Sequence, residues 1–157
     1  MNIRLSSVDR VRASLREAGI PVEVREFPDS TRTAAEAAAA IGTHTGQIVK
    51  SLVFLADHRP VLALMSGVNR LDTEALSRLT GTPIHRADAE AVRGATGYAI
   101  GGVPPAGFPQ PLQTYIDRDL LAYDQIWAAA GTPHHVFALS PSQLLALTGG
   151  TVADLKT

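Results

Sequence analysis

Residues 48–55 read IVKSLVFL, an apolar run that contains one lysine and one serine. A second apolar run, PVLALM at 60–65, follows after the four residues ADHR. Two such runs joined by a short polar link are typical of a β-hairpin, and their apolar density indicates that at least one strand is mostly buried.

Lys50 is the unusual residue of the hairpin. Strand alternation places it on the face of Ile48, Leu52 and Phe54 rather than on the face of Ser51. A lysine on an apolar strand face either runs outward to solvent or lies at the mouth of a pocket with its ammonium directed inward. The sequence leaves both alternatives open.

A second stretch, GGVPPAG at 101–107, contains three glycines and two prolines in seven residues. Proline lacks a backbone donor and glycine adds backbone freedom, so this stretch is neither mid-helix nor central strand. It is either a structural turn or a shaped loop. In the second case its N–H groups would keep fixed directions, which suits binding of a carbonyl, oxyanion or phosphate oxygen.

The remaining chain alternates between helical and strand patterns, with no internal repeat and no linker. Capping residues and apolar spacing predict helices from Ser7 to Gly19, at 33–41, 72–80 and 88–92, and from Ser140 to Gly149. Period-two patterns and apolar runs predict strands at 22–27, 83–85 and 112–116 and a closing hairpin of 126–130 and 136–139, although the alanines leave 126–130 ambiguous with helix. Together these elements predict one mixed α/β domain over 1–157, with helices around a curved mixed sheet.

Composition narrows the class of protein. The 157 residues are 45% hydrophobic and 18% charged with a net charge of -1, which is typical of a globular domain without a strong field for nucleic acid. The absence of cysteine excludes disulfides, thiolate metal sites and a catalytic thiol. Residues 1–10 lack the apolar core of a signal peptide, and no apolar run is long enough to span a bilayer. We expect a soluble protein, and a cytosolic location is compatible with these features.

The common catalytic motifs are missing from the chain. The five histidines show no metal-ligand spacing, and there is no nucleophile elbow, phosphate-binding P-loop or dinucleotide fingerprint. We therefore expect neither a metal nor a cofactor. The residues alone indicate a small α/β domain with a pocket for an anion or a carbonyl group.

The order of these features resembles the YbaK/prolyl-tRNA-synthetase-associated domain over nearly the whole chain. The similarity rests on an Ala-rich helix ending at Gly42, the lysine strand at 48–53, Gly97-Tyr98, the G-x-x-x-P loop from Gly101 to Pro105, and the Gly131 hairpin. The resemblance implies a curved mixed sheet or partly open barrel. It also implies a free-standing, cytoplasmic deacylase that hydrolyses mischarged aminoacyl-tRNA in trans. The implied substrate is tRNA-Pro or a related tRNA that carries a small non-cognate amino acid.

The resemblance also implies roles for particular residues. The N–H groups of Gly101 and Gly102 would bind the ester carbonyl or the oxyanion, and Lys50 would orient the terminal adenosine, its phosphate or the carbonyl. Lys50 is not assigned as a base, because an ammonium with an ordinary pKa is protonated at neutral pH. No protein nucleophile stands out, so water or a ribose hydroxyl of the substrate is the expected nucleophile.

Weaker candidates for substrate contacts complete the implied site: Phe27, Ser51, Pro105, Ala129 and His135. Relatives that act on cysteinyl-tRNA tend to have a hydroxyl residue near Ala129, so this alanine argues against cysteine specificity, and His135 either supplies a polar contact or lies on the surface. An aminoacyl-tRNA synthetase is a candidate partner. The alternative function is a non-catalytic module that binds tRNA ends or amino acids. The amino acid, the tRNA and the oligomeric state are not determined by the sequence.

Overall fold

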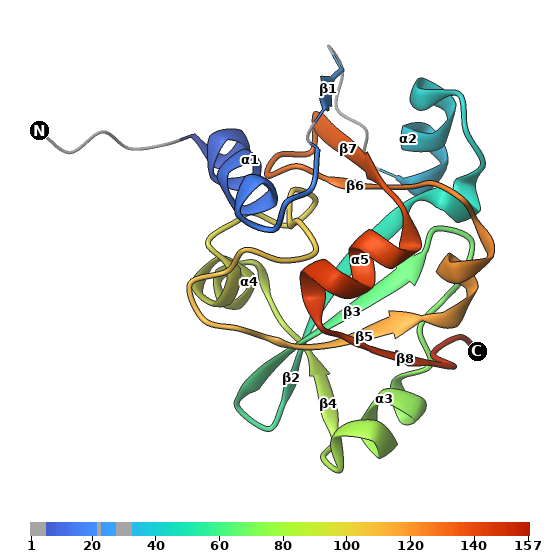
Figure 1. Ribbon diagram of the computed structural model, residues 1–157. Helices are drawn as coiled ribbons and strands as arrows, with labels where there is room; N and C mark the ends of the chain where they lie inside the picture. The colour runs from blue at the N-terminus through green and yellow to red at the C-terminus, as the bar shows by residue number, and fades with distance from the viewer. Residues whose placement is uncertain (1–5, 22, 28–32) are drawn as a thin grey trace, which may run out of the picture.

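The computed structural model describes residues 6–21, 23–27 and 33–157, and its helices lie around two open β-sheets (Figure 1). The α-helices are α1 (Ser7–Glu17), α2 (Ala34–Ile41), α3 (Thr73–Thr80), α4 (Ala89–Thr96) and α5 (Pro141–Thr148), and the 3-10 helices are η1 (Thr45–Gln47) and η2 (Arg118–Ala122). The strands are β1 (Val24–Glu26), β2 (Val49–Ala56), β3 (Arg59–Ser66), β4 (Ile84–Arg86), β5 (Gln113–Asp117), β6 (Ile126–Ala129), β7 (His135–Leu139) and β8 (Thr151–Ala153). No helix in these ranges is both long enough and apolar enough to cross a membrane.

The larger sheet has the strand order β4-β2-β3-β5-β8 and is mixed, because β3, β5 and β8 run parallel while β2 is antiparallel to both of its neighbours. The smaller sheet, β1-β7-β6, is antiparallel. A parallel bridge between Ile48 and Trp127 brings β2 beside β6 and joins the two sheets. The predicted mixed α/β fold is confirmed, with its strands divided between two open sheets.

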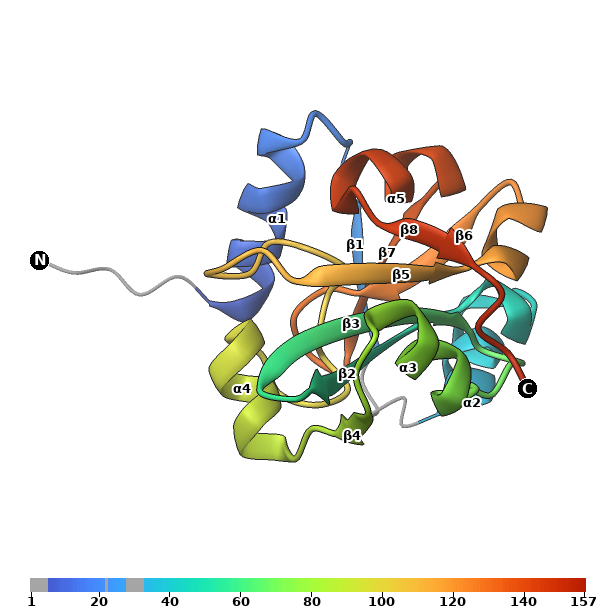
Figure 2. The same ribbon diagram turned by 90° about the horizontal axis from the view of Figure 1, so that it is seen from below.

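The predicted hairpin is confirmed as β2 and β3 (Figure 2), paired from Val49 with Ser66 to Ala56 with Arg59. The side chains of alternate residues in β3 pack into two different hydrophobic clusters. Leu62 and Leu64 belong to a cluster shared with α1, α4, α5 and the smaller sheet, whereas Val61, Ala63 and Met65 belong to a cluster shared with α3. All five side chains are fully buried. Burial on both faces explains why the sequence of β3 is continuously apolar.

Several element boundaries differ from the prediction. Helix α1 begins at Ser7 as predicted, but its N-cap is Ser6, whose hydroxyl accepts from Asp9 N, and not Ser7. Helix α4 passes through Gly94 and ends at Gly97, which has a φ of 82° and caps it. The prediction ended this helix at Val92 because glycine lowers helix propensity, yet one glycine on an exposed surface costs only about 1 kcal/mol.

The sequence did not predict the short elements that form only through contacts with other segments of the chain. Strand β8 has three residues and forms because Tyr115 and its neighbours in β5 pair with it. Helix η2 begins after Asp117, whose carboxylate accepts from Asp119 N. These segments carry little periodicity of their own, since their conformation depends on contacts with distant residues.

Candidate functional site

A pocket of about 570 Å³ lies where the start of α2, strand β2, the β6–β7 hairpin and the loop at 100–103 meet. Lys50 and Ser51 of β2 lie along it, with Gly101 from the loop and Thr132 and His135 from the hairpin. These segments are far apart in the sequence. The bridge between Ile48 and Trp127 brings β2 and β6 together and so creates the pocket.

The Lys50 side chain is partly buried and lies along this pocket. Its Nζ donates a hydrogen bond of 2.5 Å to the main-chain oxygen of Asn69. Burial lowers the pKa of the ammonium; Asp117 opposes this by raising the pKa, and Arg70 lowers it further. Lys50 therefore lies on the pocket wall, with its ammonium fixed by a carbonyl of the loop after β3.

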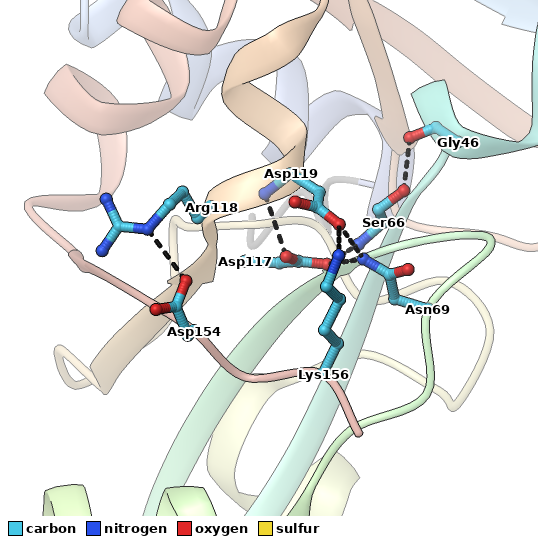
Figure 3. A network of polar contacts seen from close by, with 8 residues as sticks. All are labelled: Gly46, Ser66, Asn69, Asp117, Arg118, Asp119, Asp154 and Lys156. Atoms are coloured by element: carbon cyan, nitrogen blue, oxygen red, sulfur yellow. Dashed lines mark hydrogen bonds and ion pairs between the residues drawn. The ribbon is translucent and has the colours of Figure 1, made fainter.

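Figure 3 shows the polar network that fixes Asn69, the acceptor for Lys50. The Asn69 amide nitrogen donates to one carboxylate oxygen of Asp117 and to one of Asp119, each at 2.8 Å. The same Asp117 oxygen accepts from Ser66 N at 3.0 Å, and Asp119 also pairs with Lys156 at 2.8 Å. Asp117 is 1% exposed. This carboxylate therefore holds the loop after β3, a structural role one step removed from the pocket.

The carboxyl-terminal residues reinforce the same loop. Hydrogen bonds from Lys156 and Asn69 lower the pKa of the Asp119 carboxyl. The Asp72 N–H donates to the Leu155 oxygen, and the Thr157 N–H donates to the oxygen of Arg70. The chain end thus secures the segment that positions Lys50.

The glycine-rich stretch forms a turn at its first two residues. Gly102 N donates to Ala99 O at 3.0 Å, and Gly101 has a φ of 90°, as in turns that favour glycine at this position. Gly101 is exposed and lines the pocket, and no described residue accepts a hydrogen bond from its N–H. Gly102 is buried, and a Cβ there would lie 2.8 Å from Gly131 O and from the Thr132 Cα. The two glycines therefore serve different purposes: Gly101 borders the pocket, and Gly102 permits close packing.

His135 is fixed at the pocket edge by two neighbours. Its Nδ1 lies 2.5 Å from Thr132 Oγ1, and its Nε2 lies 3.7 Å from a Glu26 carboxylate oxygen. The side chain is 20% exposed, so it is a partly buried residue of the wall and not a surface histidine. The Thr132 hydroxyl also accepts from His134 N.

The rest of the wall is mainly apolar. Ala129 and Trp127 contribute from β6, and Arg25 lies with its guanidinium 5.0 Å from the Trp127 ring centroid. Ser51 contributes a buried hydroxyl oxygen for which no described residue is a hydrogen-bond partner. This oxygen is covered by its neighbours and presents no accessible surface to the pocket.

Five of the predicted site residues line this pocket: Lys50, Ser51, Gly101, Ala129 and His135. Gly102, Phe27 and Pro105 do not line it. Phe27 packs against the cluster that contains Ala37 and Trp127, as an ordinary core residue does, and Pro105 is buried. The burial of each side chain depends on packing that a motif does not specify.

Other residues of the site were not predicted. Thr132 was not predicted, although it follows Gly131 in a turn, where a threonine hydroxyl commonly bonds to residues two or three positions further on. Asn69 acts through its main-chain oxygen, for which the sequence carries no signal. No group of three His, Cys, Asp or Glu side chains in the described ranges is arranged to hold a metal ion.

The comparisons with known proteins agree with this geometry. Residues 28–147 match the model of the aminoacyl-tRNA editing domain. The chain therefore belongs to the aminoacyl-tRNA editing domain family, which confirms the resemblance to the YbaK/prolyl-tRNA-synthetase-associated domain.

Individual relatives are similar over most of the chain. The "Putative Cys-tRNA(Pro)/Cys-tRNA(Cys) deacylase EbsC" of Enterococcus faecalis is 30% identical over 88% of this chain and 87% of its own. The solved structure described as "Crystal structure of a putative trans-editing enzyme for prolyl tRNA synthetase" is 51% identical, has a TM-score of 0.93 and covers 99% of both chains. The proline–tRNA ligase of Streptococcus gordonii is 28% identical over 76% of this chain, a match that spans 20% of the ligase.

Proposed function

We propose that this protein is a trans-editing hydrolase that deacylates tRNA charged with a small non-cognate amino acid. The observation that carries the proposal is the presence of the Lys50 ammonium and the Gly101 turn on the walls of one pocket. Membership of the editing family supports aminoacyl-tRNA as the substrate class. Cytoplasmic action follows from that substrate.

The proposed reaction is hydrolysis of the ester between the amino acid and the terminal ribose. The carbonyl oxygen of the ester accepts hydrogen bonds from the Gly101 N–H and from Lys50. These bonds stabilise the negative charge that develops on this oxygen. Water, assisted by a ribose hydroxyl of the substrate, attacks the carbonyl carbon. The ester C–O bond then breaks, the ribose oxygen takes a proton, and a free amino acid and an uncharged tRNA end are released.

The apolar wall favours a small side chain on the amino acid. Ala129, Ala34 and Ala37 supply methyl groups, while the polar side chains of the lining include His135 and Thr132. A hydrophobic pocket separates substrates that differ by one methylene by only about 1–3 kcal/mol, which is why synthetases need a second, hydrolytic selection. We infer tRNA-Pro or a related tRNA from what the relatives' names say of those proteins.

A synthetase is the proposed partner. Proline–tRNA ligases carry a segment similar to this chain within a longer polypeptide. A separate editing protein must instead capture the mischarged tRNA after release or during a transient contact with the ligase.

The test is release of amino acid from a panel of mischarged tRNAs by wild-type protein and by Lys50→Ala. We expect hydrolysis of at least one small aminoacyl ester and a loss of about 10²–10³-fold in Lys50→Ala. His58→Ala is a matched control, because His58 lies on the same hairpin with a 98% exposed side chain. No release from any tRNA would overturn the proposal, and binding without turnover would favour the non-catalytic module.

A further inference from the structure

A second pocket, of about 440 Å³, adjoins the first along β2. The two pockets share Ser51, Leu52, Ile100 and Val103 as common walls. These shared residues form the boundary between two neighbouring pockets. Lys50 belongs only to the first pocket, so the proposed ester chemistry takes place there and the second pocket is an extension of it.

The far end of the second pocket is charged. Arg86 lies there on β4, an edge strand of the larger sheet, opposite Phe54. The Arg86 side chain is exposed, and no described residue forms an ion pair or hydrogen bond with its guanidinium. Asp88 follows, with one carboxylate oxygen capping α4 through Ala91 N at 2.8 Å. The other oxygen of Asp88 has no hydrogen-bond partner among the described residues.

Ile100 lies on the boundary between the two pockets with 56% of its surface exposed. An aliphatic side chain this exposed presents a surface on which a planar group can pack. It stands beside the Gly101 turn, so a ligand chain that enters the first pocket at Gly101 passes Ile100.

The charge at the rim of the second pocket favours an occupant other than a small apolar side chain. A guanidinium there gains nothing from contact with an apolar group and is suited to bind an anion. A nucleotide has both a planar base and an anionic phosphodiester. Proteins that bind single-stranded nucleic acid combine these same two features, a packing surface for bases and a cation for the backbone.

We propose that the second pocket binds the nucleotide that precedes the aminoacylated terminal nucleotide in a single-stranded 3′ end. Arg86 binds its phosphodiester, and the base packs against Ile100. The free oxygen of Asp88 accepts from an exocyclic amine, which cytosine, adenine and guanine carry and uracil lacks. This inference rests on the proposed deacylase function, and it assigns the part of the substrate that the first pocket leaves outside.

The experiment compares two minimal ester substrates, aminoacyl-adenosine and aminoacyl-cytidylyl-adenosine, which differ by one nucleotide. We expect wild-type protein to have a higher kcat/KM for the dinucleotide. Arg86→Ala should lower kcat/KM for the dinucleotide by about 10-fold, through KM, and leave aminoacyl-adenosine unchanged. Arg86→Lys should restore part of the loss, and Arg78→Ala on α3, an exposed residue away from both pockets, should match wild type.

A direct binding measurement accompanies the kinetics. A fluorescent RNA oligonucleotide ending in CCA, without amino acid, should bind Arg86→Ala about 10-fold more weakly than wild type, with a salt slope lower by about one. Equal kcat/KM values for the two esters, or equal effects of Arg86→Ala on both, would overturn the assignment of the second pocket as a nucleotide site. Either result would leave the deacylase proposal intact. Failure of wild-type protein to hydrolyse either ester would overturn the deacylase proposal, and unchanged oligonucleotide binding in Arg86→Ala would then overturn the nucleotide site as well.

Discussion

The Lys50 ammonium is held by a neutral group, the main-chain oxygen of Asn69, at 2.5 Å. The nearest carboxylate network, centred on Asp117, binds the Asn69 side chain instead. A carboxylate in direct contact would neutralise the lysine. A carbonyl fixes its position and leaves its charge available to an ester oxygen or a phosphate.

Replacing Lys50 by methionine should separate function from stability. Met has a similar length and no charge, so the substitution removes a cation that burial disfavours. We expect Lys50→Met to lose deacylation by about 10²-fold or more and to have a Tm equal to wild type or a few degrees higher. Differential scanning calorimetry and amino-acid release measure the two effects. A large fall in Tm would show that Lys50 is mainly structural.

The stability difference between wild type and Lys50→Met should depend on pH. Because burial lowers the pKa of Lys50 in the folded protein, the unfolded chain binds more protons between that lowered pKa and the unfolded value of about 10.4. Wild-type stability relative to Lys50→Met should therefore rise with pH in this alkaline window. Urea unfolding of both proteins at several alkaline pH values measures the slope. A slope of the opposite sign would contradict the burial of the ammonium.

Removing the Asp117 carboxylate should destabilise the fold. Asp117 is 1% exposed and accepts hydrogen bonds from Ser66 N, Asn69 and Asp119 N. Asp117→Ala leaves the Ser66 and Asp119 N–H groups without this acceptor and leaves the Asn69 amide only its bond to Asp119, at a cost of about 3 kcal/mol in the free energy of unfolding.

The matched control for Asp117 is Asp154→Ala. Asp154 pairs with Arg118 at 2.9 Å, but its side chain is 84% exposed. Exposed pairs contribute little, so we expect a change below about 0.5 kcal/mol. Urea denaturation of both variants checks the contrast. Equal costs would mean that the Asp117 network does not stabilise the loop after β3.

Alanine at Gly101 should impair activity more than its cost in stability explains. Gly101 has a φ of 90°, where alanine costs about 1–2 kcal/mol, and the nearest atom to a Cβ there would be Pro133 Cγ at an ordinary 3.4 Å. Gly81→Ala is the control, because Gly81 has a φ of 72°, open space around a Cβ and no place in the pocket. Both variants should lose similar stability, and only Gly101→Ala should lose deacylation. Alanine keeps the N–H but favours a different φ, which turns that N–H away, so full activity of Gly101→Ala would show that its direction is not required.

Arg10 should stabilise the approach to the glycine turn. Its guanidinium lies 4.5 Å from the Tyr98 ring centroid and donates to Gly97 O at 3.0 Å. Arg10→Ala should lower the free energy of unfolding by about 1–2 kcal/mol. Arg12→Ala, which removes only an exposed pair with Asp9, should cost less than about 0.5 kcal/mol. Thermal unfolding compares the two, and equal shifts would show that the contact with Tyr98 contributes nothing.

The site was predictable only where local pattern and chemistry coincide. Lys50 was predicted because a charge in an apolar strand is rare. Gly101 was predicted because a cluster of glycine and proline forms a turn or a shaped loop. Pro105 belongs to the same cluster and yet is buried outside the pocket. Its neighbours in space, not its sequence context, determine that placement.

The sequence by itself determined the periodic elements and the family. The hairpin β2–β3, the capped helices α2, α3 and α5, and the order of lysine strand, glycine loop and closing hairpin follow from local patterns, because caps, turns and alternation act over a few residues. The tertiary structure decided the two-sheet arrangement and the pairing of β8 with β5. It also decided that the Asn69 oxygen is the acceptor for Lys50 and that the two pockets share a wall. These features join residues far apart in the chain, and main-chain atoms such as the Asn69 oxygen are the same in every residue, so only packing selects which of them meet.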